Sequence, residues 1–322
     1  MDLIYCDKNK VDIGVMKDFS FDLAFGSGEN DFELETSSEN DVCEEDYFVY
    51  IEGTEYGGII DKIEVITESK TLKYKGRTWH GILNSKVIRP DEASHQAYYT
   101  VSGEANAVLR SLISHLELGS LFEGSAAASG ITISNYQFPR YVYGYDGIVA
   151  MLATVNAKLH IEFKSGHVEI SAMAMVDYSN DELDDDHIAF DIEKTFNPVN
   201  HLICLGQGDL AARTIKDLYC DANGNISTTQ TFTGIDEVAE VYDYPNVESE
   251  TELINAGTKK LKELNSSDKI DVDLDDTYEF DIGDMIYAEV VRPSLSVVRR
   301  VTKKIVKINK DQITINYNVG EV

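Results

Sequence analysis

The residues best placed for cofactor chemistry lie in one stretch, "HLICLGQGDLAAR" at 201–213. An apolar run leads there into Gly206, Gly208 and Ala211, with the spacing G-x-G-x-x-A. In a dinucleotide-binding fold this spacing forms a turn that feeds a helix, whose N-terminus faces the pyrophosphate. The next turn signal, Asn223-Gly224, comes too soon after Gly208 to leave room for a helix and a crossover. We therefore interpret the glycines as a bend between two antiparallel strands.

A second stretch begins like a calcium loop, "DANGNIS" at 221–227. Such a loop needs Gly at its sixth position and a bidentate Glu at its twelfth, where this chain has Ile226 and Phe232. We therefore predict a hairpin turn instead of a metal site. Asn223-Gly224 is expected to adopt type I′ geometry, with positive φ at both residues.

The remaining nucleophiles and metal ligands are scattered along the chain. The seven histidines contain no H-E-x-x-H motif, and His160 and His167 flank a hairpin turn, where we expect a cross-strand contact. No G-x-S-x-G motif occurs. The cysteines form no C-x-x-C pair and are expected as isolated, half-buried thiols: Cys6, Cys43, Cys204 and Cys220. We predict no catalytic residue, no cofactor and no metal site, and expect no enzymatic activity.

The charge of the chain restricts its partners. In 322 residues, 28 basic and 57 acidic side chains leave a formal charge of −29. This excess argues against a broad nucleic-acid-binding face and against an anionic membrane, because both require Lys and Arg. The N-terminus has no secretory signal pattern, and the longest weakly charged run, 147–157, is too short to span a bilayer. We expect synthesis in a cytoplasm.

The pattern of apolar residues predicts an α+β fold that is mainly β. Residues 1–100 carry apolar side chains at period two, as in "FSFDLAF" at 19–25, with turn residues between the runs. We predict for them the first of two barrel-like antiparallel domains, completed by 188–240. This first segment is expected to end near Pro90.

A helical period then predicts an inserted α+β module at 101–187. Ser102 is expected to cap one helix and Asp146 a second. Ser165-Gly166 is expected at the turn of a hairpin. The acidic run "NDELDDDH" at 180–187 closes the module.

Residues 241–322 are predicted as a second β-rich domain with one helix at about 250–264. Ser249 and Glu252 form a capping box for that helix. The final strands carry a basic strip, made up of Arg292, Arg299, Arg300, Lys303, Lys304, Lys307 and Lys310. It is either an edge strand that its cations protect from stray pairing, or a strip that meets an acidic surface on a neighbouring copy.

Several stretches together resemble phage and prophage tail hub proteins. "NDFEL" at 30–34, "GGIID" at 57–61 and "GRTWHGIL" at 76–83 are similar to their N-terminal part. "NHLICLGQGDLAAR" at 200–213 and "TGIDEVAEVYDYPNVES" at 233–249 are similar to their second half. The family comprises siphovirus tail proteins related to the baseplate hub of contractile tails and to the N-terminal domain of tail-associated lysins. The resemblance covers nearly the whole chain and depends on the order of the motifs.

The resemblance implies a structural role. Family members have two related barrel-like domains with smaller α+β domains attached, and three copies form a ring that continues the tail tube. An acidic lumen would let DNA pass without specific binding. The expected partners are two further copies, tail-tube or distal tail proteins, and tail-tip or spike proteins, in a virion or phage-like particle without a membrane anchor. Long relatives carry a further C-terminal domain, whereas this chain ends at Val322, so cell-wall hydrolysis is expected from a separate protein.

Two alternatives belong to other functional classes. One is a tail-associated cell-wall-degrading enzyme that uses carboxylates of the inserted module. The other is a carbohydrate-binding module that uses exposed aromatic residues such as Tyr141, Tyr143 and Tyr145. The type of particle, with a contractile tail, a flexible tail or a bacteriocin-like tail, stays open at this stage.

Overall fold

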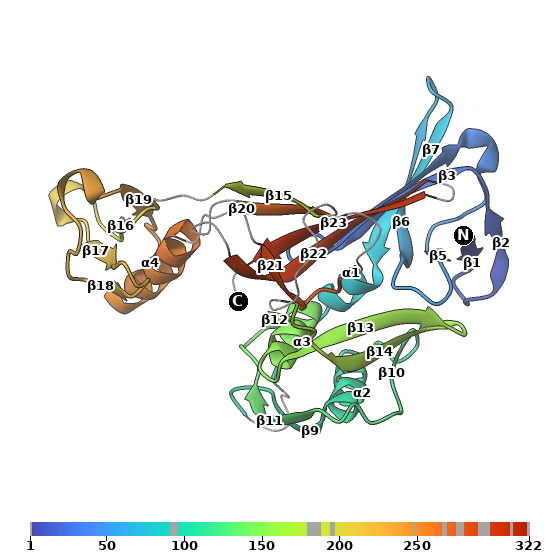
Figure 1. Ribbon diagram of the computed structural model, residues 1–322, viewed down its shortest axis with the longest axis horizontal. Helices are drawn as coiled ribbons and strands as arrows, with labels where there is room; N and C mark the ends of the chain where they lie inside the picture. The colour runs from blue at the N-terminus through green and yellow to red at the C-terminus, as the bar shows by residue number, and fades with distance from the viewer. Residues whose placement is uncertain are drawn as a thin grey trace. The chain divides into compact units, whose positions relative to one another are not determined.

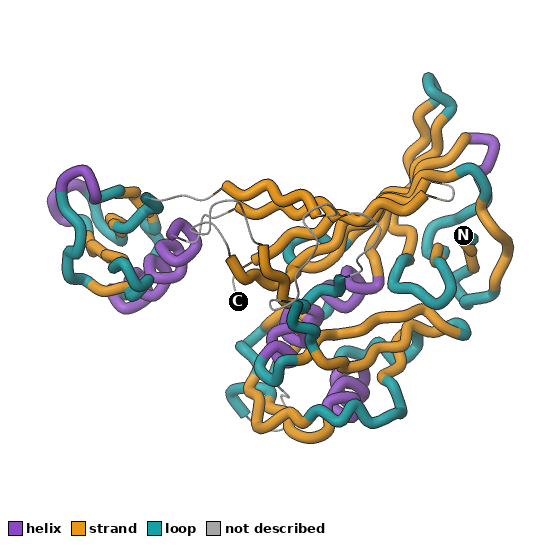
Figure 2. Tube along the Cα trace, viewed as in Figure 1, coloured by secondary structure: helices purple, strands orange, loops and turns teal. Residues whose placement is uncertain are grey.

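The computed structural model describes residues 2–90, 96–178, 188–193, 197–247, 249–265, 269–274, 280–288, 297–309 and 312–320. These residues form two compact units: unit 1 combines 1–190 with 271–320, and unit 2 comprises 191–270. Strands predominate, as Figures 1 and 2 show, and most of them pair antiparallel. The predicted fold class, α+β and mainly β, is confirmed.

The largest sheet has twelve strands, in the order β15-β20-β23-β22-β3-β4-β7-β6-β5-β1-β2, with β21 paired to β22. Their bounds are β1 (Leu3–Cys6), β2 (Asp12–Met16), β3 (Phe19–Gly26), β4 (Asp31–Ser37), β5 (Phe48–Tyr50), β6 (Gly57–Ile66), β7 (Thr71–Thr78), β15 (Ile188–Glu193), β20 (Lys269–Leu274), β21 (Met285–Ala288), β22 (Val297–Asn309) and β23 (Gln312–Gly320). A short 3-10 helix, η1 (Ser38–Asn40), follows β4.

The period-two pattern of the sequence gives this sheet two different faces. Phe21, Leu23 and Phe25 of β3 are fully buried on one face, while Asp22 and Ala24 point to the other. Burial of each such apolar side chain contributes about 1.5–3 kcal/mol. Strands β1, β2 and β5 add Leu3, Met16 and Val49 to the same core, and Ile51 joins it directly after β5.

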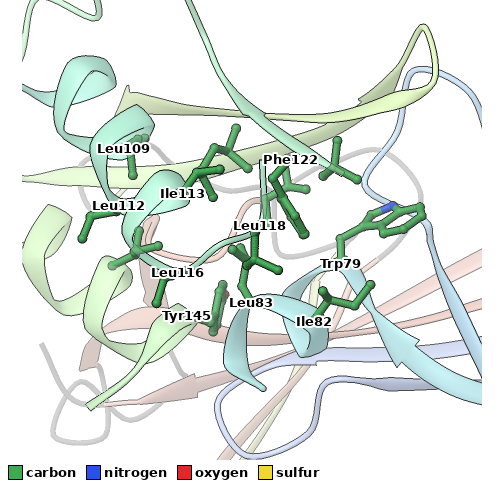
Figure 3. Packing of buried hydrophobic residues seen from close by; sticks show 14 of the residues in the cluster. Trp79, Ile82, Leu83, Leu109, Leu112, Ile113, Leu116, Leu118, Phe122 and Tyr145 are labelled. Atoms are coloured by element: carbon green, nitrogen blue, oxygen red, sulfur yellow. The ribbon is translucent and has the colours of Figure 1, made fainter. Parts of the chain in front are cut away.

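Helix α1 (Trp79–Asn84) follows β7 without a loop. Thr78 is its N-cap, and the Thr78 hydroxyl accepts a hydrogen bond from the Gly81 N–H at 3.3 Å. Trp79 and Leu83 are fully buried and begin a second core, which Figure 3 shows together with Tyr145 and side chains of the inserted module. One short helix thus connects the large sheet to the module that packs on it.

The inserted module contains two helices and short sheets. Its elements are β8 (Val87–Ile88), β9 (Thr100–Glu104), α2 (Ala105–His115), β10 (Phe122–Gly124), β11 (Thr132–Gln137), β12 (Val142–Tyr143), α3 (Gly144–Ala153), β13 (Ala157–Lys164) and β14 (His167–Ala174). The predicted β13–β14 hairpin is confirmed, with φ of 53° at Ser165 and 81° at Gly166. Leu109, Leu112 and Ile113 of α2 pack into the core of Figure 3.

Both predicted helix caps in this module are wrong. Ser102 lies within β9, and its hydroxyl accepts from the Asn135 N–H of β11, so the helix begins later, with Glu104 as its N-cap. Asp146 lies in the first turn of α3, because the chain enters that helix directly after Tyr143, at the end of the β12 ladder. The predicted closing run at 180–187 lies outside the described residues.

The N-cap of α2 is a carboxylate, so this part of the module is sensitive to acid. The Glu104 carboxylate accepts from the Ser129 hydroxyl, from the Ser129 N–H at 2.6 Å and from the Ala107 N–H at 2.9 Å, and these bonds lower its pKa to about 2. Because the pKa of Glu104 is lowered in the folded state, the ionised carboxylate stabilises the fold fully above its ordinary pKa of 4.5. This stabilisation is lost as pH falls towards 2.

Glu104→Gln is expected to lower the melting temperature at pH 6, and the difference from the unchanged chain should shrink at pH 3. Glu123→Gln, at an exposed position of β10, is the control and should change neither value.

Unit 2 is a four-stranded sheet with one helix. Its order is β18-β17-β16-β19, from the strands β16 (His201–Leu205), β17 (Ile215–Cys220), β18 (Ile226–Ser227) and β19 (Ala239–Asp243), with 3-10 turns η3 (Leu210–Ala212) and η4 (Gly234–Asp236). Helix α4 (Glu250–Asn265) packs Leu253 and Leu261 against Leu202 and Leu218. The predicted cap is present: the Ser249 hydroxyl accepts from the Glu252 N–H at 3.2 Å.

The predicted division into 1–100 with 188–240, 101–187 and 241–322 stays a prediction. In the described residues β22 pairs with β3, from Lys303 opposite Gly26 to Asn309 opposite Ser20. The strands at 201–243 pair with one another and pack against α4. In the part of the chain that the structure describes, no helix has the length and apolar character to cross a membrane.

Candidate functional site

The glycine turn after β16 is closed by its own backbone. The Gly206 N–H donates to the Thr214 carbonyl at 2.8 Å, and the Thr214 N–H donates to the Gln207 carbonyl at 2.9 Å. Strand β17 then runs back antiparallel to β16. The interpretation as a bend between antiparallel strands is confirmed, because only the short 3-10 turn η3 separates β16 from β17 and no helix follows that could face a phosphate.

The turn at 221–225 is present, but its predicted type I′ geometry is wrong. The Asp221 carboxylate accepts from the N–H groups of Asn223 and Asn225, both at 2.8 Å. Only Gly224 of the central pair has a positive φ, of 80°. The aspartate side chain organises this longer loop, so positive φ at Asn223 is not needed.

The histidines divide between exposed and paired positions. Each of the two histidines at the hairpin has the expected cross-strand neighbour, His160 opposite Ser171 and His167 opposite Lys164, but they do not lie opposite one another. The missed arrangement is in unit 2, where His201 Nδ1 lies 2.6 Å from Glu237 and Nε2 lies 2.9 Å from Asp217. Three separate strands or loops supply these side chains, so no local motif indicates them. Within the described ranges no group of three or more His, Cys, Asp or Glu residues could hold a metal ion.

The four cysteines are buried more deeply than the half-buried positions expected. Burial, the largest cause, raises the pKa of Cys6 and of Cys43 to about 12 and that of Cys204 to about 11. A thiol reacts as its thiolate, so these groups are inert near neutral pH.

The basic strip lies on an interior strand, so the edge-strand interpretation is wrong. Strand β22 pairs with β23 on one side and with β3 on the other. Its lysines neutralise carboxylates of the same chain: Lys303 contacts Glu29 at 2.5 Å, and Lys307 lies 3.6 Å from Asp22. Arg299 and Arg300 are half-buried near the start of the strand, and Arg292 and Lys310 lie outside the described residues.

Lys304 forms the centre of a buried ionic cluster. Its ammonium contacts Glu55 at 2.7 Å and Asp281 at 2.9 Å. Lys158 of β13 contacts Asp281 and Asp284, both at 2.8 Å. Burial alone would lower the pKa of Lys304, but the carboxylates of Glu55 and Asp281 outweigh it and hold that pKa well above its usual value. The cluster joins β22, the β5–β6 loop and the inserted module within unit 1.

The uncovered face of β22, β3, β4, β7 and β6 carries charges of both signs, and we name it the charged face. One row across it runs from Lys307 through Asp22, Glu33 and Lys75, which lie opposite one another on successive strands. Its ion pairs are Lys307–Asp22, Lys73–Glu33, Lys73–Glu35, Lys75–Glu33, Lys75–Glu64, Arg77–Asp61 and Lys303–Glu29. Most cations of this face are therefore already neutralised.

A groove of about 470 Å³ lies in the charged face. It is lined by Asp22, Ala24, Asp31, Phe32, Glu33, Asp61, Lys62, Lys75, Gly76 and Arg77. Burial, with Glu29 nearby, raises the pKa of Asp31 above its ordinary value. Most of the side chains that line the groove are charged, so it offers an extended polar surface.

Comparison with known proteins identifies the class of fold. No family model matches the sequence, and no curated protein matches it either. The prophage tail protein gp18 from Listeria monocytogenes EGD-e is 12% identical, with 100% of this chain and 95% of that chain covered and a TM-score of 0.50. The 43 kDa tail protein of prophage MuSo2 from Shewanella oneidensis is 9% identical, with 100% and 98% covered and a TM-score of 0.53.

The chain therefore has the fold of prophage tail proteins. The resemblance to phage tail hub proteins is confirmed as a likeness of fold over the whole chain.

Proposed function

We propose that this chain is a structural component of a phage or phage-like tail, a baseplate or tail-tip hub whose three copies form a ring that continues the tail tube. The observation that carries the proposal is the extent of the match, since 100% of this chain aligns with 98% of the MuSo2 tail protein. The chain then belongs in the virion tail, in contact with other tail proteins. Its role is assembly and not catalysis.

The charged face is suited to line the passage of such a ring. DNA binds to surfaces that offer free Lys and Arg for its phosphates. On this face Lys73, Lys75 and Arg77 are each within 3.2 Å of a carboxylate of the same chain. With a net charge of −29, the ring would repel a passing duplex and hold no phosphate. This is the acidic lumen of the proposal.

The proposal is tested by the position of the chain in a particle. An epitope-tagged chain, labelled with gold and imaged by electron microscopy, is expected only at the distal end of the tail. The isolated complex is expected to have the mass of three copies. Label along the whole tube, or a lytic band from the pure chain on cell-wall zymograms, would reject the proposed role, the latter in favour of the cell-wall-degrading alternative.

Arg299 and Arg300 test the contact between copies that the basic strip suggested. Changing both to Glu reverses two charges on a half-buried segment of an acidic protein, so ring formation is expected to weaken at least tenfold. The measurement is the ring fraction by analytical ultracentrifugation. Lys307→Glu on the same strand is the control, since its side chain is 55% exposed on the charged face. Equal ring fractions for the double variant and the control would assign the contact to another surface.

A further inference from the structure

The inserted module presents an exposed aromatic patch on the small β8–β12 ladder. Val142 lies opposite Ile88 and Tyr143 opposite Val87. Ile88 is fully buried, so this face of the ladder points into the core. The alternate positions point outward. These outward positions, together with exposed residues next to the ladder, form what we name the ladder patch: Val87, Arg89, Arg140, Tyr141 and Tyr143.

The two tyrosines of this patch have unusual exposure. Tyr141 is 61% exposed and Tyr143 57% exposed. Tyr145, the third aromatic residue of the same run, is only 4% exposed and contacts the edge of the His80 ring in the core. Two of the three tyrosine rings are therefore exposed to solvent, and the third packs in the core.

Tyr141 is also held in a strained conformation. Its φ is 59°, a left-handed backbone that is unfavourable for a residue with a bulky side chain. The Arg140 guanidinium lies 5.3 Å from the centre of the Tyr141 ring, which fixes a cation against one face of it. The backbone and the cation together hold the Tyr141 ring at the surface.

The charge of the patch differs from that of the rest of the chain. Arg140 lies over the Tyr141 ring, and the exposed Arg89 directly follows Ile88 of the ladder, in a protein with a net charge of −29. Neither arginine makes an ion pair with a carboxylate among the described residues, unlike the paired cations of the charged face. The patch also comprises five residues, well short of the roughly 20–30 that each side of a stable protein interface uses. A small anionic ligand fits this surface better than a protein.

We propose that the ladder patch binds an anionic carbohydrate, a chain of sugar units that carry phosphate or carboxylate. The apolar C–H face of a sugar ring can pack on an exposed tyrosine ring, and an arginine fork can donate two hydrogen bonds to a phosphate or carboxylate. Tyr141 and Tyr143 supply the rings, and Arg140 and Arg89 supply the donors. This binding activity is separate from the tail role proposed above and does not depend on it.

The test measures binding of the full chain by titration calorimetry. The probes are a glucosylated poly(glycerol phosphate), polygalacturonate, neutral amylose, poly-glutamate and inorganic phosphate. Binding is expected for one or both of the first two, and which of them binds assigns phosphate or carboxylate as the anion. Tyr141→Ala, Tyr143→Ala and Arg140→Gln are each expected to weaken that binding at least tenfold.

Matched variants separate stacking from loss of fold. Tyr141→Phe and Tyr143→Phe keep the rings and should retain binding within about threefold, because the ring face packs on the sugar. Lys17→Gln, at an exposed position outside the patch, should bind like the unchanged chain. The proposal is overturned if neither anionic glycan binds. It is also overturned if poly-glutamate or inorganic phosphate binds as tightly, which would indicate an acidic protein partner or a simple anion site, or if the alanine variants leave glycan binding unchanged.

Discussion

Replacing Lys304 by methionine is expected to lower the free energy of unfolding by about 3–5 kcal/mol, because it leaves the largely buried Glu55 carboxylate with only a 3.6 Å contact to His80. Methionine fills similar volume, so the loss comes from the charge and not from a cavity. Glu55, whose side chain is 19% exposed, loses its 2.7 Å contact with the ammonium. Asp281 is 43% exposed and keeps Lys158, so most of the cost is at Glu55.

The measurement is urea unfolding followed by fluorescence of Trp79, the single tryptophan and a fully buried one. The matched control is Lys307→Met, three residues further along β22. Its side chain is 55% exposed and lies 3.6 Å from Asp22, so the expected change is within about 1 kcal/mol. If both variants lose the same stability, the buried cluster has no special role.

The same cluster predicts the direction of the acid response. Burial alone would raise the pKa of Glu55 and of Asp281, but Lys304 outweighs it and lowers both. A carboxylate with a lowered folded pKa stabilises the fold above its ordinary pKa, and this contribution is lost as pH falls through the folded value. The difference between the unchanged chain and Lys304→Met should therefore be largest near neutral pH and shrink in strong acid.

Gly81→Ala is expected to destabilise unit 1 by about 2–3 kcal/mol, although alanine favours a helix by up to about 1 kcal/mol over glycine. A Cβ at Gly81 would lie 2.1 Å from the Asn30 carbonyl oxygen. That carbonyl accepts from the Thr78 N–H, and the Asn30 side chain exchanges two hydrogen bonds with the Gly26 backbone, so it has little freedom to move. The helix α1 would have to shift away from the β3–β4 turn.

Thermal unfolding followed by circular dichroism measures this effect. Gly119→Ala is the control, because a Cβ at Gly119 meets nothing within 4 Å. It should leave the melting temperature unchanged or raise it slightly, through the smaller freedom of the unfolded chain. A Gly81→Ala protein as stable as the control would show that α1 can move at little cost.

The sequence predicted the local elements better than their partners. Runs with apolar residues at period two predicted the strands of residues 1–100, and apolar residues at helical spacing predicted α4 with its Ser249 cap. Both patterns depend only on residues close together in sequence. The Ser102 cap failed because pairing of β9 with β11 continues the strand through Ser102 to Glu104, so Glu104 caps the helix that begins at Ala105. Tertiary pairing therefore decided a boundary that local preference could not.

The candidate surfaces show the same limit. The sequence pattern of the basic strip fits both an edge strand and an interior strand with one polar face. Only the pairing of β22 with β3 shows which of these it is. Tyr141, Tyr143 and Tyr145 alternate as if on one strand, but α3 begins at Gly144, so the period changes and Tyr145 turns into the core. The partners of His201 come from β17 and a distant loop, which no motif spacing records.

The pairing of β3 with β22 also sets the order in which the protein can be completed. Lys303 and Glu29, which meet beside this pair, are 274 residues apart in sequence. While the ribosome is still adding residues, β3 therefore has only β4 beside it, and its other hydrogen-bonding groups stay open. The large sheet can close only after β22 has left the exit tunnel. Until then, the edge of β3 that pairs with β22 in the complete chain has no strand beside it.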